Sequence, residues 1–451
     1  MEKLFKLQEH GTDVKTEVTA GVTTFLAMVY ILAVNPNILA ASGMDSAAIF
    51  TATAVSAAFA TLVMAFYANY PVALASGMGL NAYFSYSVCI PLAQSGVQDP
   101  WKIALAAVFV EGIIFILLSL TNFREKLVND IPQNLKLGIT AGIGLFITII
   151  GMKDAGIVIG DSATLVALGS LKTPQVALAL FGFLIIAVLS HFNVRGAILI
   201  GILGTWVLGM IAQATGWYQV DVANGVYSVY PSMHGGLFST HVNWFSFDFN
   251  WIGNNIMDFV VICFSFLFVD IFDTVGTLIG IANKGNLLDE NGKLPRAKQA
   301  LLSDAVGTVF GACMGTSTVT SYVESSAGVA AGGRTGLTAL VTGILFLVAL
   351  PFSPIFLSIP GFATTPALIW VGLLMISSIK NMSFDGDIAD VVSGFMAIVM
   401  MPFTYSIANG IMFGMLSWVI LKVLTGRAKE VNGIMWICFV LFAFRIFTLV
   451  H

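Results

Sequence analysis

Long apolar runs follow one another along almost the whole chain. A helix of about 20 residues crosses the ~30 Å hydrocarbon core of a bilayer. Fourteen runs approach or reach that length, near residues 17–41, 48–68, 70–90, 100–120, 134–152, 174–191, 196–213, 255–282, 298–313, 316–332, 335–356, 363–379, 388–404 and 406–424. The 451 residues are 57% hydrophobic and only 10% charged, whereas soluble proteins carry about 25% charged residues. The sequence therefore predicts an all-α polytopic membrane protein with fourteen transmembrane spans.

Lysine and arginine lie mainly on one side of these predicted spans. If the tail of residues 1–16 is inside, sixteen basic residues lie on the inner side: Lys3, Lys6, Lys15, Arg124, Lys126, Lys136, Arg195, Lys284, Lys293, Arg296, Lys298, Arg334, Lys380, Lys422, Arg427 and Lys429. Only Lys102, Lys153 and Lys172 lie outside, and the connector of residues 214–254 has neither Lys nor Arg. Because cytoplasmic loops are enriched in basic residues, we expect a cytoplasmic N-terminus and an extracellular connector in the cell's plasma (inner) membrane.

The connector divides the spans into two sets of seven, so the second set enters the membrane in the opposite direction. Span 3 (ALASGMGLNAYFSYSV, residues 73–88) and span 10 (GTSTVTSYVESSAGVAAGG, residues 315–333) then occupy matching positions. Both are rich in Gly and Ser, which predicts broken helices with short extended segments. Interrupted spans at matching positions of inverted repeats indicate a binding site near the midplane. The alternative is that the small residues only permit close helix packing.

Acidic residues occur inside two of the apolar runs. Asp270 and Asp273 lie three residues apart in span 8, where they share a helical face, and Glu324 lies in span 10. No Lys or Arg occurs between Gly196 and Asn283. An ionisable group at membrane depth is costly without a partner or a wet cavity, so it marks a functional site. We expect these acids to bind a ligand or to carry a proton, and one of the two aspartates to tie helices together instead.

Polar and aromatic residues near the acids extend this surface. A half-helix that begins at Glu324 would present free backbone N–H groups to a cavity, and an amide beside it offers both a donor and an acceptor. A surface with both donors and acceptors suits a flat, neutral heterocycle. Aromatic side chains can stack on the faces of such a ring. The further residues that we expect to contact such a substrate are Asn81, Tyr83, Phe84, Thr318 and Val323.

Other chemistries lack the residues that they need. The four cysteines lie in apolar runs without metal-ligand spacing. The sequence has no zinc motif, nucleophile elbow or phosphate loop, and no basic stripe for nucleic acid. We therefore expect no enzymatic activity, no metal, no cofactor and no nucleic-acid partner. A channel is disfavoured as well, because two short broken segments do not form a continuous polar pore stripe.

Four segments resemble a known transporter family: FLAMVYILAVNP (residues 25–36), GMGLNAYF (77–84), FVDIFDTVGTL (268–278) and TSTVTSYVESSAGVAAGGRTGLTAL (316–340). They resemble the hypoxanthine/guanine/adenine permease branch of the nucleobase–ascorbate (nucleobase:cation symporter) transporter superfamily, and the similarity runs nearly end to end. The uracil and xanthine branches have differently built motifs in spans 8 and 10, so the chain resembles them less.

The resemblance implies two inverted seven-span repeats that form two domains. The core domain would comprise residues 17–120 and 255–356, and the gate domain would comprise residues 134–213 and 363–424. Substrate would lie between the broken spans 3 and 10, and the core would move against the gate, which often forms a homodimer.

The resemblance also assigns roles to the polar residues. Matched by motif, Asp270 and Glu324 would be the acids that contact the base. Asn81 and Asp273 would be second essential polar positions.

These observations predict a secondary active transporter that imports the purine nucleobases adenine, guanine and hypoxanthine by proton symport. A uracil or xanthine carrier and an uncoupled facilitator remain alternatives, since Asp and Thr could equally serve sodium. The last apolar run, residues 432–449, contains Arg445 and predicts either a helix on the membrane surface or an extra span.

Overall fold

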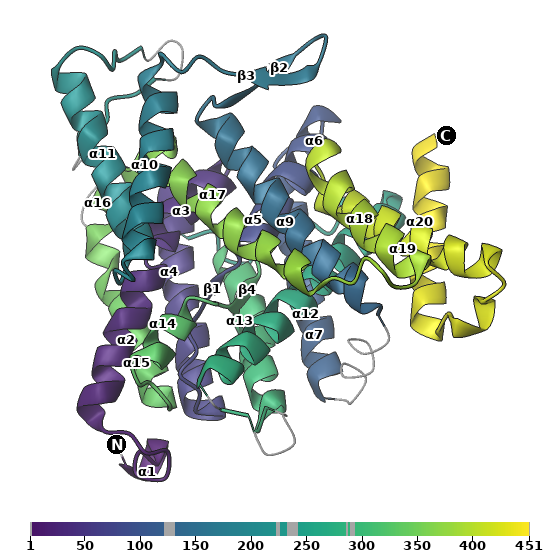
Figure 1. Ribbon diagram of the computed structural model, residues 1–451, viewed down its shortest axis with the longest axis horizontal. Helices are drawn as coiled ribbons and strands as arrows, with labels where there is room; N and C mark the ends of the chain where they lie inside the picture. Colours follow the sequence, from purple (N-terminus) through teal and green to yellow (C-terminus); the bar gives the residue numbers. More distant parts are fainter. Residues whose placement is uncertain are drawn as a thin grey trace.

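The computed structural model describes residues 2–120, 131–221, 226–231, 242–285, 287–288 and 294–450. It shows a helical molecule in which the N-terminus and the β2–β3 hairpin lie at opposite ends (Figure 1). Three basic residues assigned to the inner side, Arg124, Lys126 and Lys293, lie outside the described residues. Part of the predicted connector also lies outside them.

The first part of the chain forms helices that are interrupted twice. These elements are α1 (Glu2–Phe5), α2 (Val14–Met28), α3 (Ile31–Ala40), α4 (Ser46–Val63) with the π-helix η1 (Met64–Ala68), β1 (Leu74–Ser76), α5 (Met78–Ala82), the π-helix η2 (Tyr83–Cys89), α6 (Ile90–Gln94), α7 (Pro100–Leu120), α9 (Gln133–Asp154), β2 (Val158–Asp161), β3 (Leu165–Leu168), α10 (Pro174–His191) and α11 (Ala197–Ala214).

The second part repeats this alternation of long helices and short elements. Its elements are η4 (Trp251–Asn254), α12 (Ile256–Gly285), α13 (Ala297–Met314), β4 (Val319–Ser321), α14 (Ser325–Ala330), α15 (Gly336–Val348), η5 (Leu350–Phe352), α16 (Ser353–Leu357), α17 (Gly361–Ile376), η6 (Ser377–Asn381), α18 (Ile388–Phe403), α19 (Ile407–Leu424), η7 (Ala428–Glu430) and α20 (Gly433–Val450).

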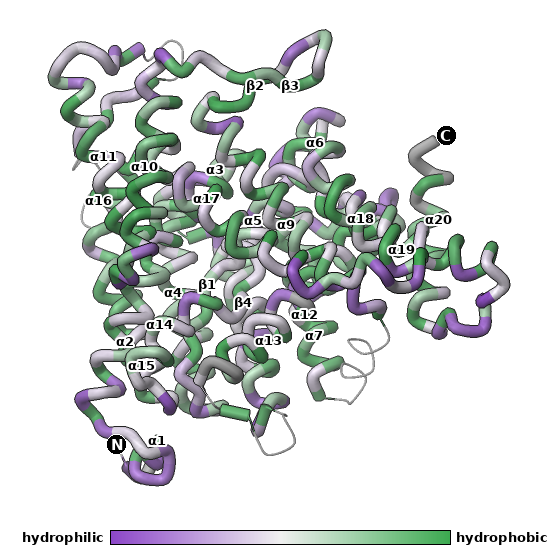
Figure 2. Tube along the Cα trace, in the orientation of Figure 1, coloured by the Kyte–Doolittle hydropathy of each residue, from purple (hydrophilic) through white to green (hydrophobic). Residues whose placement is uncertain are grey.

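Within the described ranges, nine helices are long and apolar enough to cross a membrane, or ten if the pair bent by 41° at α15 forms one span. Hydrophobic residues run along these helices, and hydrophilic ones gather at the lower and right-hand edges of the molecule (Figure 2). The fourteen predicted spans exceed ten by four. Spans 3 and 10 are broken, α18 has only 16 residues, and α13 is less apolar because it contains Lys298 and Asp304. The chain is a multi-pass membrane protein of helical architecture.

The two broken segments meet at the centre of the molecule (Figure 1). Strands β1 and β4 pair antiparallel, with Leu74 opposite Ser321 and Ser76 opposite Val319. Each strand has three residues and is fully buried. Pairing satisfies backbone groups that would otherwise be unbonded at membrane depth, where no water can replace a partner. The extended backbone expected from the Gly- and Ser-rich sequences therefore lies inside the protein, away from lipid.

Two sets of helices pack mainly within themselves. In one set α2, α4, α7, α12, α13, α14 and α15 surround the β1–β4 pair, and in the other α9 packs on α17 and α18, with α10, α11 and α19 alongside. Glycines bring α9 close to its neighbours, since a Cβ on Gly138 would lie 2.5 Å from the carbonyl oxygen of Gly394. A Cβ on Gly144 would lie 2.8 Å from the carbonyl oxygen of Gly372. These contacts require small residues on both helices.

The buried acid Glu17 joins the first helix of the first set to α15. Its carboxylate accepts hydrogen bonds from the backbone N–H of Arg334 at 2.8 Å and from the hydroxyls of Thr335 and Thr338 at 2.8 and 2.7 Å. The backbone N–H of Thr338 adds a fourth at 3.1 Å. Because these donors lie at the N-terminus of α15, the acid caps that helix, and its role is structural.

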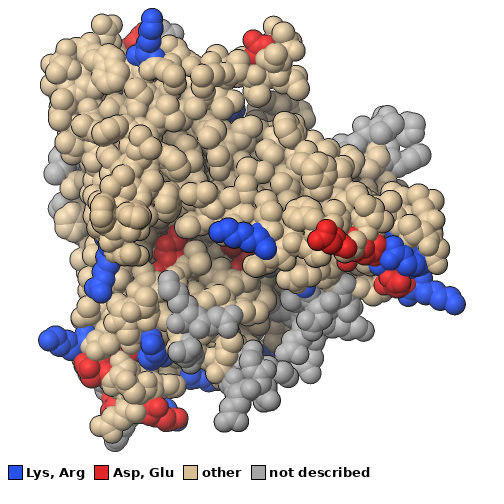
Figure 3. All heavy atoms as spheres, viewed as in Figure 1, with Lys and Arg blue, Asp and Glu red and all other residues tan. Residues whose placement is uncertain are grey.

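Charged residues cluster where α18 begins and α19 ends (Figure 3). Asp387 accepts two hydrogen bonds from the guanidinium of Arg427, at 2.8 and 2.6 Å, and pairs with Lys422 at 2.5 Å. Arg427 first, and then Lys422, hold the pKa of Asp387 below its usual range. The cluster ties the start of α18 to the end of α19.

The β2–β3 hairpin and the last helix add to what the sequence predicted. The hairpin of β2 and β3 was not predicted, and its strands pair antiparallel from Val158 opposite Leu168 to Asp161 opposite Leu165. The last apolar run forms the helix α20, which packs on α19 and α12. Phe442 of α20 is buried and meets Phe264 of α12 edge to face, with ring centroids 5.5 Å apart.

Candidate substrate-binding site

A cavity lies where the β1–β4 pair meets α12 and α17. It encloses about 430 Å³ with its open mouth included, and its lining is formed by Tyr30, Gly77, Met78, Gly79, Asp273, Thr277, Thr320, Ser321, Tyr322, Val323, Glu324, Val371 and Met375. Of the helices in the second packing set, only α17 contributes to this lining. The cavity therefore lies between the two sets of helices.

Glu324 reaches the cavity because β4 ends just before it. It is the residue before α14, so its side chain lies at the junction of the extended and helical parts of span 10. The hydroxyl of Tyr30 donates a hydrogen bond to Glu324 Oε1 at 2.5 Å. Tyr30 itself is fully buried and lies in the short break between α2 and α3.

Asp273 is the second acid of the cavity, and it comes from α12. Thr320 of β4 and Glu324 line the same cavity as Asp273. Within the cavity lining, neither Lys nor Arg accompanies the two acids. A neutral ligand with N–H donors suits such a site, because the carboxylates accept hydrogen bonds and no cation competes for them.

Asp270 lies away from the cavity. Residues i and i+3 of a helix are offset by about 60° around its axis, and the rotation of α12 turns Asp273 toward the cavity and Asp270 into the protein. Asp270 is fully buried. Its Oδ1 lies 3.3 Å from the hydroxyl of Thr274, which also bonds to Asp304 Oδ2 at 2.9 Å. The sequence predicted a substrate contact at Asp270, and that role stays a prediction.

Asp304 connects this interior network to the cavity. Its Oδ1 accepts a hydrogen bond from the hydroxyl of Ser321, a residue of the cavity lining, at 3.1 Å. Asp304 is fully buried in α13. The sequence analysis did not select it, although its isolated charge within an apolar helix was the same signal that selected Asp270.

Asn81 and its neighbours hold the first broken segment in place. The hydroxyl of Ser76 donates to Asn81 Oδ1 at 2.7 Å, and the hydroxyl of Tyr322 donates to the carbonyl oxygen of Ser76 at 2.6 Å. Asn81 is fully buried and is absent from the cavity lining. Its amide therefore supports the end of β1 in this conformation, and the predicted contact with substrate stays a prediction.

Of the remaining predicted contacts, one lines the cavity and three lie outside its lining. Val323 lines the cavity and is 47% exposed, so it marks the open side. Thr318 is fully buried in the approach to β4 and is absent from the lining. Tyr83 and Phe84 are buried against Phe266, with ring centroids 4.8 and 6.4 Å away. The aromatic side chains that do reach the cavity are Tyr30 and Tyr322.

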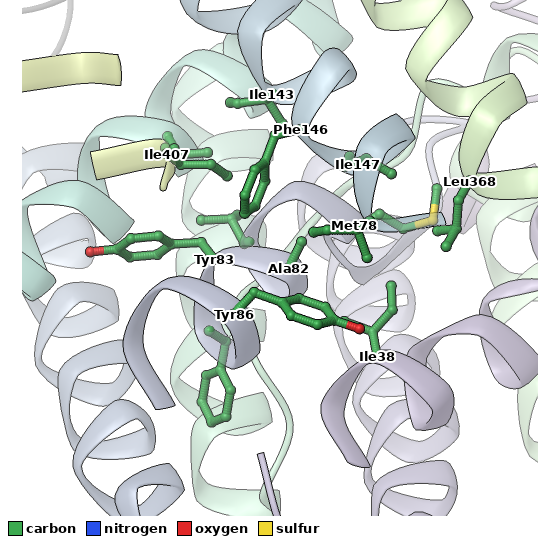
Figure 4. Packing of buried hydrophobic residues seen from close by; sticks show 14 of the residues in the cluster. Ile38, Met78, Ala82, Tyr83, Tyr86, Ile143, Phe146, Ile147, Leu368 and Ile407 are labelled. Carbon is green, nitrogen blue, oxygen red and sulfur yellow. The ribbon is translucent and has the colours of Figure 1, made fainter. Parts of the chain in front are cut away.

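One side of the cavity is closed by apolar packing between the two sets of helices. Met78, Ala82, Tyr83 and Tyr86 face Ile143, Phe146 and Ile147 of α9, Leu368 of α17 and Ile407 of α19, as Figure 4 shows. The hydroxyl of Tyr86 also donates to Asp154 Oδ2 at 3.1 Å. The seal therefore lies toward the end of α9 and the start of α17.

The opposite side is less tightly closed. Thr277 and Met375 lie one turn beyond Asp273 and Val371 in their helices, and all four line the cavity. Together with the exposed Val323, they place the mouth toward the ends of α12 and α17.

No three His, Cys, Asp or Glu side chains among the described residues are grouped in a way that could hold a metal ion. Tyr30, Thr277 and Asp304 were missed by sequence reasoning as site residues. Tyr30 stands in one of the segments that carry the family resemblance, but its contact to Glu324 joins residues 294 positions apart, and no local pattern reveals such a pair.

Comparisons with known proteins agree with this architecture. The sequence pattern of a family described as Permease family matches residues 15–413. The chain is 43% identical to the adenine permease AdeP of Escherichia coli (strain K12), with 99% of this chain and 96% of the relative covered. It is 44% identical to the guanine/hypoxanthine permease PbuO of Bacillus subtilis (strain 168), with 99% and 100% covered.

Solved transporters share the fold at low identity. The transmembrane domain of the cyanobacterial bicarbonate transporter BicA matches with a TM-score of 0.62 at 16% identity, over 88% of this chain and 96% of that domain. The structure of SLC26A9 matches with a TM-score of 0.64 at 12% identity, over 91% of this chain and 66% of that one. The resemblance inferred from the sequence is confirmed, and the protein is a membrane transporter rather than an enzyme: the chain belongs to the Permease family.

Proposed function

We propose that the protein carries purine nucleobases across the plasma membrane and that they bind in the cavity between β1, β4, α12 and α17. The observation that carries this proposal is the pair of acids, Glu324 and Asp273, facing one cavity that lacks a cation in its lining. Relatives at 43–44% identity are named as adenine and guanine/hypoxanthine permeases. Neutral purines present ring N–H donors, and adenine and guanine also carry an amino donor, and carboxylates can accept hydrogen bonds from these groups.

The two acids and the backbone supply complementary contacts. Glu324 and Asp273 would accept hydrogen bonds from the base, and the backbone around Gly77 and Gly79 can approach a flat ring closely because neither residue has a Cβ. Tyr322 and Val371 would enclose its faces. In this arrangement Asp270 serves the site indirectly, through Thr274 and Asp304, and Asn81 holds the end of β1.

The two packing sets would act as a core domain and a gate domain of an inverted repeat with fourteen spans. The count of fourteen rests on the predicted runs, of which spans 3 and 10 are broken, α18 has 16 residues and α13 is less apolar. The core would slide against α9 and α17 so that the cavity opens to either side in turn. If the N-terminus is cytoplasmic, the Tyr86 seal lies on the outer side and the cavity opens inward.

An inward proton gradient would drive uptake by proton symport. Two carboxylates in one cavity repel each other when both are ionised, so a proton that enters with the substrate lowers the energy of the loaded core. A neutral purine and a proton would then cross together. Pairing of two copies through the gate helices, expected from the family resemblance, is part of the same proposal.

Reconstituted protein tests both the substrate and the coupling. Proteoliposomes with an inward proton gradient at fixed sodium should accumulate labelled adenine, guanine or hypoxanthine above equilibrium, and a protonophore should abolish the accumulation. Uracil and xanthine serve as comparison substrates. Transport of uracil or xanthine without any purine would overturn the substrate assignment. Equilibration alone, or accumulation driven by sodium alone, would overturn proton symport.

A further inference from the structure

Tyr30 is the cavity residue whose role the acid pair does not explain. It comes from the first span, where α2 ends at Met28 and α3 begins at Ile31. Its ring is fully buried, so packing fixes its position, while its hydroxyl reaches the cavity and donates to Glu324 Oε1 at 2.5 Å. The contact joins the first half of the chain to the second half at the site itself.

A hydroxyl is a suitable partner for an acid that changes its protonation state. Toward ionised Glu324, the Tyr30 hydroxyl acts as a donor. Toward protonated Glu324, the same oxygen can accept the proton of the acid. Lys or Arg could only donate and would hold the acid ionised. Tyr30 therefore occupies one oxygen of Glu324 in either state, and a ligand N–H can bind at the other oxygen without displacing it.

The other groups around Glu324 do not substitute for this contact. Asp273 of α12 and Tyr322 of its own loop are the further titratable side chains near it. Asp273 is itself an acid and would repel ionised Glu324, and the Tyr322 hydroxyl donates to the carbonyl oxygen of Ser76. The lining residues from α5 and α17, such as Met78 and Val371, bring no charge. Tyr30 is thus the side-chain donor to Glu324 among the described residues.

We propose that Tyr30 is a positioning residue that orients the Glu324 carboxyl group for the substrate and sets the pH range in which that group is ionised. The orientation part rests on the proposed function, because it needs a purine ligand. The protonation part does not, since it concerns two side chains of the empty protein.

The substitution Tyr30→Phe removes the hydroxyl and keeps the buried ring. Tyr322→Phe is a matched control for the titration. It also removes a buried hydroxyl from the cavity, but this hydroxyl donates to the carbonyl oxygen of Ser76 and not to Glu324. The probe is the infrared band of protonated carboxyl groups in the purified full-length protein, followed as the pH is changed. The part of the band that Glu324→Gln abolishes is assigned to Glu324.

Loss of a hydrogen bond to the ionised form makes protonation easier, so the Glu324 band of Tyr30→Phe should persist to a pH about one unit higher than in the unchanged protein. The Tyr322→Phe protein should titrate like the unchanged one. An unshifted Glu324 band in Tyr30→Phe would overturn the proposal. Equal shifts in both variants would also overturn it, since they would show a general disturbance of the cavity.

Binding of adenine and hypoxanthine to the same proteins tests the orientation of Glu324. Tyr30→Phe should bind them about tenfold more weakly at a pH where Glu324 is ionised in both proteins. Unchanged affinity in Tyr30→Phe would overturn the orientation role. If the unchanged protein binds no purine, the proposed function fails, whereas the infrared titration still decides the protonation role.

Discussion

The two broken segments share a backbone plan and differ in chemistry. Each consists of a three-residue strand followed by a short helix, and the two strands pair with each other. The first segment offers the cavity Gly77, Met78 and Gly79, whereas the second offers Thr320, Ser321, Tyr322 and Glu324. We infer that the first segment contributes close approach of its backbone, and that the second contributes the polar side chains that recognise the ligand. Removing side chains should harm the second segment, and adding them should harm the first.

The largest effect should follow from Glu324→Gln in the second segment. The change replaces an acceptor that carries charge by an amide that places a donor toward the ligand's N–H, and a hydrogen bond to a charged group is worth about 1.5–3 kcal/mol. We expect the affinity for adenine and hypoxanthine to fall about 10- to 100-fold at normal abundance in the membrane. Equilibrium binding to purified protein measures this, and near-normal affinity would remove Glu324 from the site.

The next largest effect on purine affinity should distinguish the two aspartates of α12, of which only Asp273 lines the cavity beside the second segment. Asp273→Asn should weaken purine binding about tenfold, because it removes an acceptor from the cavity. Asp270→Asn changes a residue behind the cavity, in contact with Thr274, and should lower the melting temperature more than the affinity. Binding and thermal unfolding of both variants give the comparison. A reversed order would restore Asp270 as the substrate contact that the family resemblance implies.

Much of this arrangement could be predicted from the sequence. The apolar runs predicted the helices, and the Gly- and Ser-rich composition of spans 3 and 10 predicted the two broken segments that contain β1 and β4. Two of the three acids selected within apolar runs, Asp273 and Glu324, line the cavity. These signals are local: each depends on a few neighbouring residues and on the cost of polar groups in lipid.

What could not be predicted depends on contacts between distant parts of the chain. Asp270 and Asp273 share a helical face, and the rotation that exposes only Asp273 to the cavity is set by the packing of α12 on α7 and on β4. Tyr30 in an apolar run is indistinguishable from a packing residue until Glu324 is placed beside it. Asn81 follows the break in span 3, and only the structure shows its amide turned back to Ser76.

A smaller effect should come from adding a methyl group to the first segment. In Gly79→Ala the new Cβ would lie 2.7 Å from Ile143 Cγ2 of α9, and overpacking of this kind costs about 1–3 kcal/mol. We expect the rate of purine uptake to fall about fivefold, which corresponds to about 1 kcal/mol, because α5 must pass α9 when the core moves. Gly276→Ala in α12 is the control, since a Cβ there meets nothing within 4 Å.

A second substitution shows whether the contact itself causes the loss. Ile143→Ala removes the side chain that the new methyl group would strike. The double variant Gly79→Ala, Ile143→Ala should therefore recover most of the uptake that Gly79→Ala loses. If Gly276→Ala slows uptake as much as Gly79→Ala, or if the double variant shows no recovery, close approach at Gly79 does not limit transport.

The smallest effect on binding should come from Asn81→Ala, which tests the first segment for side-chain recognition. The change removes the acceptor of the Ser76 hydroxyl, which keeps only the hydrogen bond that it accepts from Thr316, and the loss of one buried hydrogen bond costs about 0.5–1.5 kcal/mol. We expect the melting temperature to fall by about 2–4 °C for each kcal/mol lost, while the affinity for purines changes less than threefold. Ser76→Ala removes the same hydrogen bond from its other end, so the double variant should lose little more stability than either single one.

A tenfold loss of affinity in Asn81→Ala with unchanged stability would show that Asn81 contacts the substrate. The first segment would then recognise the ligand through a side chain as the second does, and the difference between the two segments would be one of degree.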